Sequence, residues 1–494
     1  MHFGYLTPDA CYQAMKAHDL RFDGHFFVGV ASTGIYCRPI CRVRLPRQQN
    51  CAFYPSAAAA EAAGFRPCLR CRPELAPGFA ATEASAKLAR SAARMIEDGI
   101  ANDVDLPFVA GRIGVTDRHL RRIFAEEFGV SPVQYAQTHR LLLAKRLLTD
   151  TSLPVAQIAF ASGFSSVRRM NALFAERYGF SPTRLRKEGR KFGADATDAL
   201  TFALPYRPPY DFGRLLAFLG MRALPGVESV SDGVYRRIVR AGDASGWLEV
   251  GHLPTRHALQ LRFAASLAAA TQALLSQTKQ VFDVAADPLE IATALGALAA
   301  GAEGLRLPGA FDPFELALRA ILGQQVSVKA ARTLASRFVD AFGEPVATPF
   351  AELTRAFPTP SRIAELTRDD IGRLGIVGQR AQAMIALAQA VNSGALDLGD
   401  VGSAAEPAQA IATLCAIRGV GPWTAHYIAM RALAWPDAWP SLDVALLNAL
   451  NLPNTLAGQR RADAQAEAWR PWRSYAVLHL WRSLEGIDRT EETR

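Results

Sequence analysis

The chain has 494 residues, of which 50% are hydrophobic and 20% are charged, and its formal net charge is +9. These values are typical of globular proteins, indicate about three domains and exclude a disordered or fibrous chain. The sequence has no apolar run of about 18 residues and no basic N-terminal segment followed by an apolar core, so we expect no membrane span, secretory signal or membrane partner. Seven cysteines, an odd number, suit a reducing, cytoplasmic compartment.

The positive charge lies in the N-terminal two-fifths of the chain. Residues 1–192 contain 27 Lys and Arg against 16 Asp and Glu, a net charge of +11, whereas the rest of the chain contains 28 against 30, a net charge of −2. We therefore expect the N-terminal part to attract a polyanion through its overall charge. Any DNA contact of the C-terminal part must depend on a local patch and on backbone dipoles.

Two cysteine pairs lie in arginine-rich stretches near the N-terminus. Cys37 and Cys41 have the spacing C-x3-C, and after 26 further residues Cys68 and Cys71 have the spacing C-x2-C. Such pairs place four thiolates around one Zn²⁺ at about 2.3 Å. On spacing alone, a structural staple for a small domain is the simpler interpretation. Basic neighbours favour a further role, because they bind phosphates and keep thiolates nucleophilic. The predicted DNA-binding residues in this stretch are Arg38, Arg42 and Arg44.

The segments TGIYCRPICR and AAGFRPCLRC, with Phe53 and Tyr54 between them, resemble the N-terminal zinc domain of the Ada family of alkylation-damage sensors. The resemblance implies one Zn²⁺ and assigns Cys37 as the residue that irreversibly accepts a methyl group from a methylphosphotriester in DNA. It also implies a switch, because a thioether on Cys37 removes one negative charge and should raise the affinity for promoter DNA. Activation of promoters implies RNA polymerase as a further partner.

Two similar helix-turn-helix units lie within residues 84–190, about 45 residues apart. In each, an apolar helix ends near a Gly, and a Thr or Ser N-caps a following helix with Arg on its face. The predicted recognition helices, 117–127 and 165–177, offer these side chains to a major groove. The alternative, an ordinary bundle with a solvated basic face, is disfavoured by the duplication, and the pattern resembles the AraC-type DNA-binding domain. The predicted DNA-binding residues are Arg118, Arg121, Arg122, Arg168 and Arg169.

The second methyltransferase domain of Ada is not expected in this chain. That domain would carry a Pro-Cys-His-Arg motif, and the sequence has no such motif. The only cysteine after residue 71 is Cys415, in an apolar helical context typical of a buried core residue. Repair of O6-alkylguanine is therefore not predicted.

A helix-hairpin-helix is predicted at LCAIRGVGPWTAHYIAM, residues 414–430. Gly419 and Gly421 lie between two helical patterns, and Pro422 suits a first helical turn, so backbone N–H groups can approach a DNA phosphate. A bare Gly-x-Gly is weak evidence, because glycines often terminate helices. Asp443 begins a later helical pattern in an apolar neighbourhood. Taken alone it is more simply a helix N-cap, but the hairpin favours a catalytic carboxylate.

Residues 200–485 resemble AlkA, the 3-methyladenine DNA glycosylase of the helix-hairpin-helix superfamily. Matching segments include YRPPYDFGRLLAFLGMRALPGVESV, GLRLPGAFDPFELALRAILGQQVSV, GVGPWTAHYIAMRAL and RPWRSYAVLHLW. The resemblance assigns Asp443 as the catalytic aspartate, which stabilises an oxocarbenium-like sugar and orients water. It assigns Trp423, Tyr427 and Trp481 as walls that stack on a cationic alkylated base. Core packing is the alternative for these rings.

Three further features refine the resemblance to AlkA. Trp423 stands where strand-cutting relatives carry a Lys, so no Schiff base can form and a monofunctional enzyme is predicted. The C-terminal region lacks the four cysteines of the iron–sulfur variants, so no cluster is expected. Gln325 occupies the position of the apolar wedge that fills the gap left by a flipped base, and its amide can stack and hydrogen-bond the orphaned partner.

The sequence thus predicts a multidomain α+β protein that is mostly helical. It is expected to be a bifunctional DNA alkylation repair and regulatory protein of the bacterial cytoplasm, associated with the nucleoid and with alkylated and promoter double-stranded DNA. One alternative is a transcription regulator with an inactive glycosylase fold, and another is a glycosylase whose N-terminal parts only anchor DNA. The predicted domains are a zinc-binding methyl-acceptor domain at 1–78, a tandem helix-turn-helix domain at 84–190, a small antiparallel-sheet domain at 200–286 and a helix-hairpin-helix glycosylase domain at 287–494.

Overall fold

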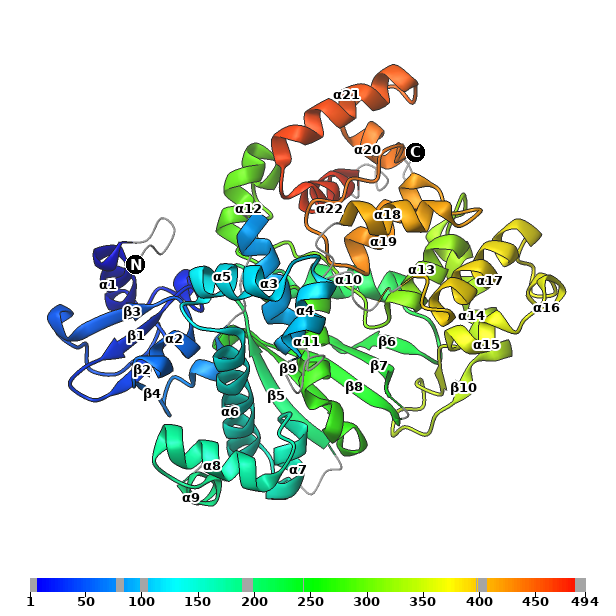
Figure 1. Cartoon of the computed structure of the whole chain (residues 1–494). Coiled ribbons are helices and arrows are strands. Elements are labelled where there is room, and N and C mark those ends of the chain that lie inside the picture. The colour runs from blue at the N-terminus through cyan, green and yellow to red at the C-terminus, as the bar shows by residue number, and fades with distance from the viewer. Residues whose placement is uncertain are drawn as a thin grey trace. The chain divides into compact units, whose positions relative to one another are not determined.

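The computed structural model describes residues 7–76, 84–97, 105–188, 199–242, 244–396, 398 and 407–484. The chain forms two compact units (Figure 1). The first unit comprises Met1–Pro208, Leu253–Lys279 and Val284–Ala286, and the second comprises Pro209–His252, Gln280–Asp283 and Asp287–Arg494. The expected α+β, mostly helical fold is confirmed, whereas the four domain boundaries remain predictions. Among the residues so described, no helix combines the length and apolarity that crossing a membrane requires.

The N-terminal part of the first unit is built on a four-stranded sheet of order β3-β1-β2-β4. The central strand β1 pairs antiparallel with β2 and β3, and β4 pairs in parallel with β2. Because β2 ends at Cys37 and β4 leads into Cys68, this pairing brings the two cysteine pairs together. The Cys68 N–H donates to the Tyr36 carbonyl at 3.0 Å. The elements of this part are α1 (Pro8–Lys16), β1 (Phe27–Val30), β2 (Ile35–Cys37), β3 (Cys51–Tyr54), α2 (Ala57–Ala62) and β4 (Arg66–Pro67).

Helices follow the sheet, and they include both expected recognition helices. α5 begins after Thr116, whose side chain accepts from the His119 N–H at 3.3 Å, and α8 begins after Ser166, which accepts from the Arg169 N–H at 3.2 Å. Each helix buries residues spaced by four, namely Leu120, Phe124 and Phe128 in α5 and Met170, Phe174 and Tyr178 in α8. The helices are α3 (Ala84–Glu97), α4 (Leu106–Arg112), α5 (Asp117–Phe128), α6 (Pro132–Asp150), α7 (Val155–Ala161), α8 (Val167–Tyr178) and α9 (Pro182–Glu188).

Antiparallel strands occur in both units. In the first unit β5 (Ala199–Pro205) pairs with β9 (Ala258–Ala264). The helix α11 (Thr271–Val281) also begins in the first unit. In the second unit β6, β7 and β8 form an antiparallel meander. These three strands span Glu228–Ser231, Val234–Ala241 and Ala244–Leu253.

The remaining helices of the second unit include α13, which is buried along most of its length and packs against α14, α17 and α19. α18 packs on α19, and the connection between them is the predicted hairpin. A small two-stranded pair, β10 (Glu344–Pro345) and β11 (Arg355–Ala356), joins the same unit. The helices are α10 (Phe212–Arg222), α12 (Pro288–Leu295), α13 (Pro313–Leu322), α14 (Val328–Phe342), α15 (Pro360–Ala364), α16 (Arg368–Gly372), α17 (Gly378–Asn392), α18 (Pro407–Ala416), α19 (Pro422–Arg431), α20 (Val444–Ala449), α21 (Leu456–Ala466) and α22 (Arg473–Leu484).

Candidate metal centre and active site

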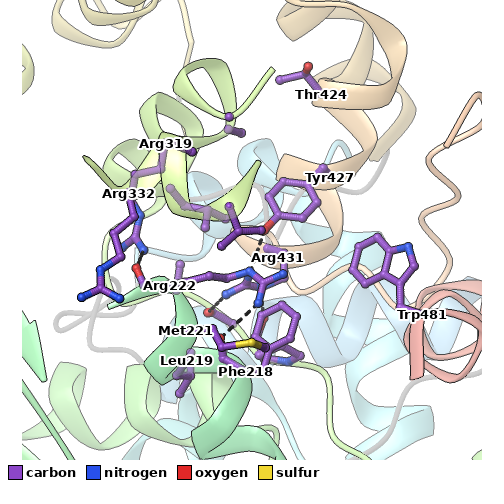
Figure 2. A pocket seen from close by; sticks show the side chains of 18 of the residues that line it. Phe218, Leu219, Met221, Arg222, Arg319, Arg332, Thr424, Tyr427, Arg431 and Trp481 are labelled. Carbon is purple, nitrogen blue, oxygen red and sulfur yellow. Dashed lines mark hydrogen bonds between the residues drawn. The ribbon is translucent and has the colours of Figure 1, made fainter. Parts of the chain in front are cut away.

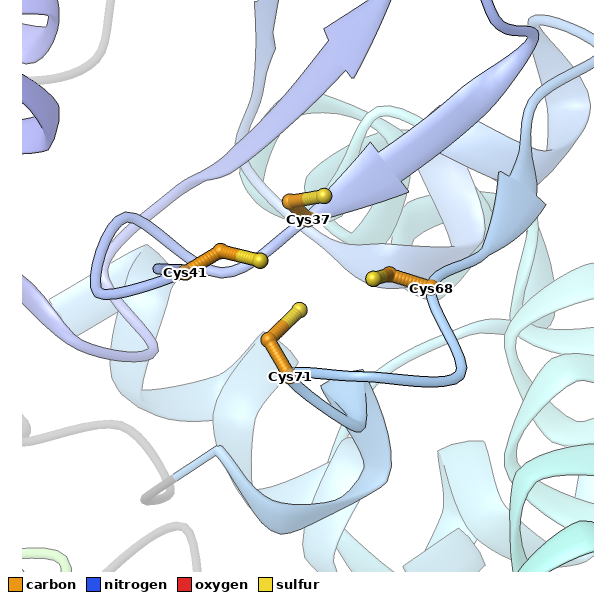
Figure 3. Close-up of side chains that lie close together, drawn as sticks. All are labelled: Cys37, Cys41, Cys68 and Cys71. Atoms are coloured by element: carbon orange, nitrogen blue, oxygen red, sulfur yellow. The ribbon is translucent and has the colours of Figure 1, made fainter. Parts of the chain in front are cut away.

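The four predicted metal ligands converge in the first unit (Figure 3). The sulfur atoms of Cys37, Cys41, Cys68 and Cys71 all lie within 4.8 Å of one another. A tetrahedron of Zn–S bonds of about 2.3 Å separates its sulfurs by roughly 3.8 Å, so this donor set fits one Zn²⁺. Cys37, Cys41 and Cys68 are buried and Cys71 is half-buried. The expected zinc site with four cysteine ligands is confirmed.

Backbone hydrogen bonds fix the loops that carry these ligands. The Cys41 N–H donates to the Arg38 carbonyl at 3.1 Å, and the Arg72 N–H donates to the Cys68 carbonyl at 3.2 Å. The Arg38 N–H donates to the Cys71 sulfur at 3.4 Å. Such a bond draws charge from a metal-bound sulfur, so Cys71 is stabilised as a ligand and made less nucleophilic.

Arg38 lies inside the protein and not on the DNA-facing surface that its sequence context suggested. Its side chain is 5% exposed, and its guanidinium pairs with Asp23, with Nε at 2.8 Å from Oδ1. It also donates through Nη1 to the Cys71 carbonyl at 3.1 Å. We therefore assign Arg38 to holding the Cys71 loop, whereas Arg42 and Arg44 are exposed beside the cluster.

The five arginines predicted on the recognition helices are all exposed. Arg121 and Arg122 pair with acidic residues one turn away on α5, at 3.1 Å to Asp117 and 2.9 Å to Glu126. Exposed pairs of this kind contribute about 0.3–0.5 kcal/mol, so they do not prevent the side chains from turning to phosphates or bases. Arg168 and Arg169 lie on the first turn of α8.

The second unit contains one large cleft, of about 2330 Å³, among the residues the structure describes there. Helices α10, α13, α14, α18, α19, α20 and α22 contribute to its walls, together with the loops that precede α14, α19 and α20. The cleft brings together the residues predicted for this unit, namely Gln325, Gly419, Gly421, Trp423, Tyr427, Asp443 and Trp481. A groove of this size holds a segment of a polymer as well as a small pocket.

Aromatic rings form one wall of the cleft. Trp423 and Tyr427, one turn apart on α19, lie parallel, with ring centroids 5.3 Å apart and an interplanar angle of 8°. Trp481 of α22 lies 6.4 Å from Tyr427 at 42°. All three residues are half-buried and border the cleft, so they are not enclosed in the core. Figure 2 shows Tyr427 and Trp481 from these two helices around a common space.

Asp443 has the helix N-cap role that its sequence context suggested, and its catalytic role stays a prediction. It is the N-cap of α20, because its Oδ1 accepts from the Leu446 N–H at 3.1 Å. Its Oδ2 accepts from the Trp423 Nε1–H at 2.9 Å, so the carboxylate is tied directly to the aromatic wall. The residue is 9% exposed and borders the cleft. Both carboxylate oxygens therefore have a fixed direction.

The hairpin between α18 and α19 has the backbone geometry that its glycines predict. Gly419 has φ 95°, and a Cβ there would lie 3.0 Å from the Ala383 Cβ. Gly421 is exposed and extended, N-caps α19, and has open space where a Cβ would stand. Gln324 supports the hairpin by donating to the Gly419 carbonyl at 2.8 Å and the Thr424 hydroxyl at 3.0 Å.

A group of arginines beneath the aromatic wall was missed by the sequence reasoning. Arg431 is 3% exposed and donates to the Tyr427 hydroxyl at 2.9 Å, as Figure 2 shows. Arg222 places its Cζ 3.7 Å above the Phe218 ring. Burial would raise the pKa of Tyr427, but the guanidinium charges of Arg431, Arg222 and Arg319 outweigh it and lower that pKa. The sequence did contain a signal for this contact, because Tyr427 and Arg431 are four residues apart on a predicted helix and therefore lie on the same face.

Two other predicted positions have informative surroundings. Gln325 is exposed, borders the cleft and has φ 55°, so it projects from a tight turn between α13 and α14. Cys415 is only partly buried and borders the same cleft, so the expectation that it is a core residue is wrong. It lies on α18 next to Leu414, which is buried in the core, whereas Cys415 itself borders the cleft.

Family models match four successive parts of the chain. Residues 10–74 match the metal binding domain of Ada, and residues 109–188 match a helix-turn-helix domain. Residues 201–312 match the AlkA N-terminal domain. Residues 318–474 match the HhH-GPD superfamily base excision DNA repair protein. These matches and the two sites define a protein that joins a metal-binding and helix-turn-helix part to a base-excision repair part.

A relative that matches almost the whole chain identifies the family. The probable bifunctional transcriptional activator/DNA repair enzyme AlkA of Mycobacterium tuberculosis is 38% identical over 97% of this chain and 96% of its own length. The chain belongs to this family of bifunctional transcriptional activator/DNA repair enzymes. DNA-3-methyladenine glycosylase 2 of Escherichia coli is 38% identical over 57% of this chain and 96% of its own. The bifunctional transcriptional activator/DNA repair enzyme Ada of Escherichia coli is 38% identical over 29% of this chain and 38% of its own.

Proposed function

We propose that the protein repairs alkylated DNA in two ways and reports the damage to promoters. The second unit hydrolyses the N-glycosidic bond of alkylated bases such as 3-methyladenine. In the first unit, Cys37 accepts a methyl group from a DNA methylphosphotriester, and the methylated protein activates transcription. The proposal rests above all on the contact between Asp443 and the aromatic wall, in one cleft beside a helix-hairpin-helix.

Asp443 supplies negative charge where the deoxyribose becomes positive. As the N-glycosidic bond breaks, its electron pair leaves with the base and the sugar acquires oxocarbenium character. A carboxylate already fixed by Trp423 and Leu446 needs little reorganisation to stabilise that charge. Water then adds to C1′ and loses a proton, which leaves a free base and an abasic sugar. Because position 423 carries no amine, no Schiff base forms and the strand is not cut.

The aromatic wall binds the extruded base by stacking. The parallel rings of Trp423 and Tyr427 present π-faces to the cleft, and a base stacked on such a face gains about 1–3 kcal/mol. A positively charged alkylpurine is attracted further by the electron-rich rings. Arg431 withdraws electron density through the Tyr427 hydroxyl, so that Trp423 is the stronger cation-binding face of the pair.

Methyl transfer to Cys37 forms an S–CH₃ bond and breaks the CH₃–O bond of the triester, so the phosphate regains its negative charge as a diester. When bound, Zn²⁺ holds the cluster sulfurs as thiolates at neutral pH. The N–H···S bond from Arg38 lowers the nucleophilicity of Cys71, which leaves Cys37 as the better acceptor. Arg42 and Arg44 hold neighbouring phosphates so that the DNA backbone can fit closely against Cys37, which is 6% exposed.

Methylation of Cys37 removes one negative charge from the zinc site and thereby strengthens binding to promoter DNA. The arginines on α5 and α8 read the promoter in successive major grooves, and RNA polymerase is the partner recruited there. This function places the protein on the nucleoid in the bacterial cytoplasm. In this proposal residues 1–78 are the methyl-acceptor domain and residues 84–190 the promoter-binding domain. Residues 200–286 and 287–494 are the sheet domain and the helix-hairpin-helix domain of the glycosylase.

Substitution of Asp443 by Asn tests the excision activity. Asn is as good an N-cap as Asp, so Asp443→Asn keeps the helix start of α20, removes the charge and replaces the oxygen that accepts from the Trp423 Nε1–H with an NH₂ group. We expect release of 3-methyladenine from alkylated duplex DNA to fall about 100-fold or more. Asp211→Asn is the matched control, because Asp211 also borders the cleft and N-caps α10, accepting from the Arg214 N–H at 2.9 Å. Unchanged release by Asp443→Asn would contradict the catalytic role of Asp443, and no release by the wild-type protein would favour a regulator with an inactive glycosylase fold.

Peptide mapping by mass spectrometry tests the methyl acceptor. After incubation of the zinc-loaded protein with DNA that carries methylphosphotriesters, we expect a gain of about 14 daltons on the peptide that contains Cys37. Fragmentation of the peptides distinguishes Cys37 from Cys71, the more exposed residue of the two. A methyl group on Cys71, or on none of the four cysteines, would contradict the assignment.

A further inference from the structure

Leu442 has an unusual backbone and an unusual exposure for a leucine. It directly precedes Asp443 and borders the same cleft. Its φ is 75°, in the left-handed region that side-chain-bearing residues rarely adopt, and it is 51% exposed. Neither the N-cap role of Asp443 nor the packing of the core requires an apolar side chain at this position.

The turn that carries Leu442 explains its conformation. The Asp443 N–H donates to the Pro440 carbonyl at 3.3 Å, which closes a four-residue turn with Leu442 in its third position. A positive φ at that position is the mark of a type II turn, where Gly is the usual residue. A leucine therefore stands where the backbone favours glycine, and strain of this kind is concentrated at functional sites.

Neighbouring residues hold the strained turn in place. The Ser441 hydroxyl donates to Asp463 of α21 at 2.8 Å, and the Trp439 Nε1–H donates to the same carboxylate at 2.9 Å. Trp439 is 5% exposed and anchors the start of the turn in the core. The backbone around Leu442 is thus held by Ser441 before it and by Asp443 after it, so its exposure is not that of a loose loop tip.

The cleft has another exposed side chain at positive φ, Gln325, in the turn between α13 and α14. When a base leaves a duplex, an apolar side chain can fill the gap and keep the neighbouring pairs apart. Gln325 is polar and can instead hydrogen-bond the orphaned base. Another exposed residue of the cleft must then supply the apolar surface that fills the gap. Leu442 is exposed, borders the cleft and directly precedes Asp443, so it can do so.

We infer that Leu442 is a positioning residue that inserts against the duplex next to the extruded nucleotide and holds its sugar over Asp443. The inference rests on the proposed glycosylase function. The partner of Leu442 is double-stranded DNA, because an unstacked base step in a duplex exposes apolar surface that a leucine can cover. In this arrangement Gln325 hydrogen-bonds the orphaned base, and Leu442 supplies the apolar surface that fills the gap.

Two substitutions remove the leucine without disturbing the turn. Leu442→Gly relaxes the positive φ, and Leu442→Asn retains a residue type that tolerates it. We expect the melting temperature to stay the same or rise, whereas kcat/KM for 3-methyladenine release from duplex DNA falls at least 10-fold. Leu442→Met, which keeps an apolar chain, should restore most of the activity. Leu456→Asn, an exposed leucine of α21 that does not border the cleft, is the control.

Fluorescence of 2-aminopurine separates insertion from catalysis. The full-length protein is titrated onto a duplex with a tetrahydrofuran abasic analogue and 2-aminopurine at the adjacent position, so no bond is cleaved. We expect a fluorescence change for the wild-type protein that is at least halved by Leu442→Gly and Leu442→Asn. Wild-type excision and fluorescence in both variants would overturn the role of Leu442 and leave the glycosylase intact. Loss of insertion in these variants together with no release of 3-methyladenine by the wild-type protein would instead overturn the glycosylase assignment alone.

Discussion

Glu61 and Tyr178 are 117 residues apart in the sequence, yet the Tyr178 hydroxyl donates to Glu61 Oε1 at 3.2 Å. The same oxygen accepts from Tyr36, the neighbour of Cys37, at 3.0 Å, and Oε2 accepts from Thr138 of α6 at 2.9 Å. Glu61 is 6% exposed. One buried carboxylate therefore joins the strand that ends at Cys37, the proposed methyl acceptor, to the last residue of α8.

The protonation of Glu61 predicts a pH dependence of stability. Burial raises its pKa to about 7, against the lowering effect of its hydrogen bonds to Thr138, Tyr36 and Tyr178. Between pH 4.5 and 7 the folded state keeps a proton that the unfolded state releases, so this group lowers the free energy of unfolding as the pH rises through that window. Glu61→Gln imitates the protonated form, so its free energy of unfolding should gain roughly 2–3 kcal/mol relative to the wild type between about pH 5 and pH 8.

Thermal unfolding of the full-length, zinc-loaded protein checks this prediction. The quantity to compare is the difference between Glu61→Gln and wild type at each pH, because other titrating groups and the metal affect both proteins alike. Glu126→Gln, an exposed residue of α5, is the control and should show no such trend. A difference between Glu61→Gln and wild type that does not grow from about pH 5 to pH 8 would contradict the raised pKa.

Motifs with fixed local geometry were predictable from the sequence. The cysteine spacing is sufficient for the zinc cluster, and Thr116 and Ser166 mark the helix starts because an N-cap acts over three residues. Gly419 likewise has the positive φ that a hairpin needs. Each of these signals depends on neighbours in the chain, so no tertiary information was required.

Partners distant in the chain were beyond the same reasoning. The sequence around Arg38 indicates a basic surface, but Asp23, fifteen residues earlier, pairs with it inside the fold. Nothing in the local pattern around Glu61 indicates that it meets Tyr178. The prediction that Cys415 is a core residue was wrong because an apolar helix can line a cleft as well as a core. Such contacts are set by packing, which short patterns do not encode.

Removal of the metal should separate the two activities. The ligands lie in the first unit and the residues around Asp443 lie in the second, so a chelator should abolish methyl transfer to Cys37 while excision of 3-methyladenine remains within about two-fold. Because zinc binding contributes folding energy to a small site, the first unit should also become more sensitive to protease. Both activities are measured on one treated sample, and restoration by added Zn²⁺ is the control. A parallel loss of excision would mean that the second unit depends on the metal.

The Tyr427 ring should contribute more than its hydroxyl to excision. Tyr427→Phe keeps the stacking face against Trp423 and loses only the hydrogen bond from Arg431, so we expect kcat/KM to change by less than about five-fold. Tyr427→Ala removes the face and should lose about 10- to 100-fold, in line with 1–3 kcal/mol for a stacked base. Single-turnover release of 3-methyladenine measures both. Equal losses in the two variants would show that the hydroxyl, and not the ring, is what the base requires.

The two glycines of the hairpin should fail in different ways when they are replaced by alanine. At Gly421 the backbone is extended and a Cβ meets nothing within 4 Å, so Gly421→Ala should fold normally. If a DNA phosphate approaches this backbone closely, the methyl group should nonetheless weaken duplex binding several-fold.

At Gly419 the positive φ and the contact with Ala383 should destabilise the fold itself, by more than the roughly 1–2 kcal/mol that a left-handed alanine costs. Gly394→Ala is the matched control, since Gly394 has φ 74° and open space around a Cβ. Melting temperatures and binding to a duplex with an abasic analogue distinguish the cases. Full DNA affinity in Gly421→Ala would mean that the phosphate does not contact this hairpin.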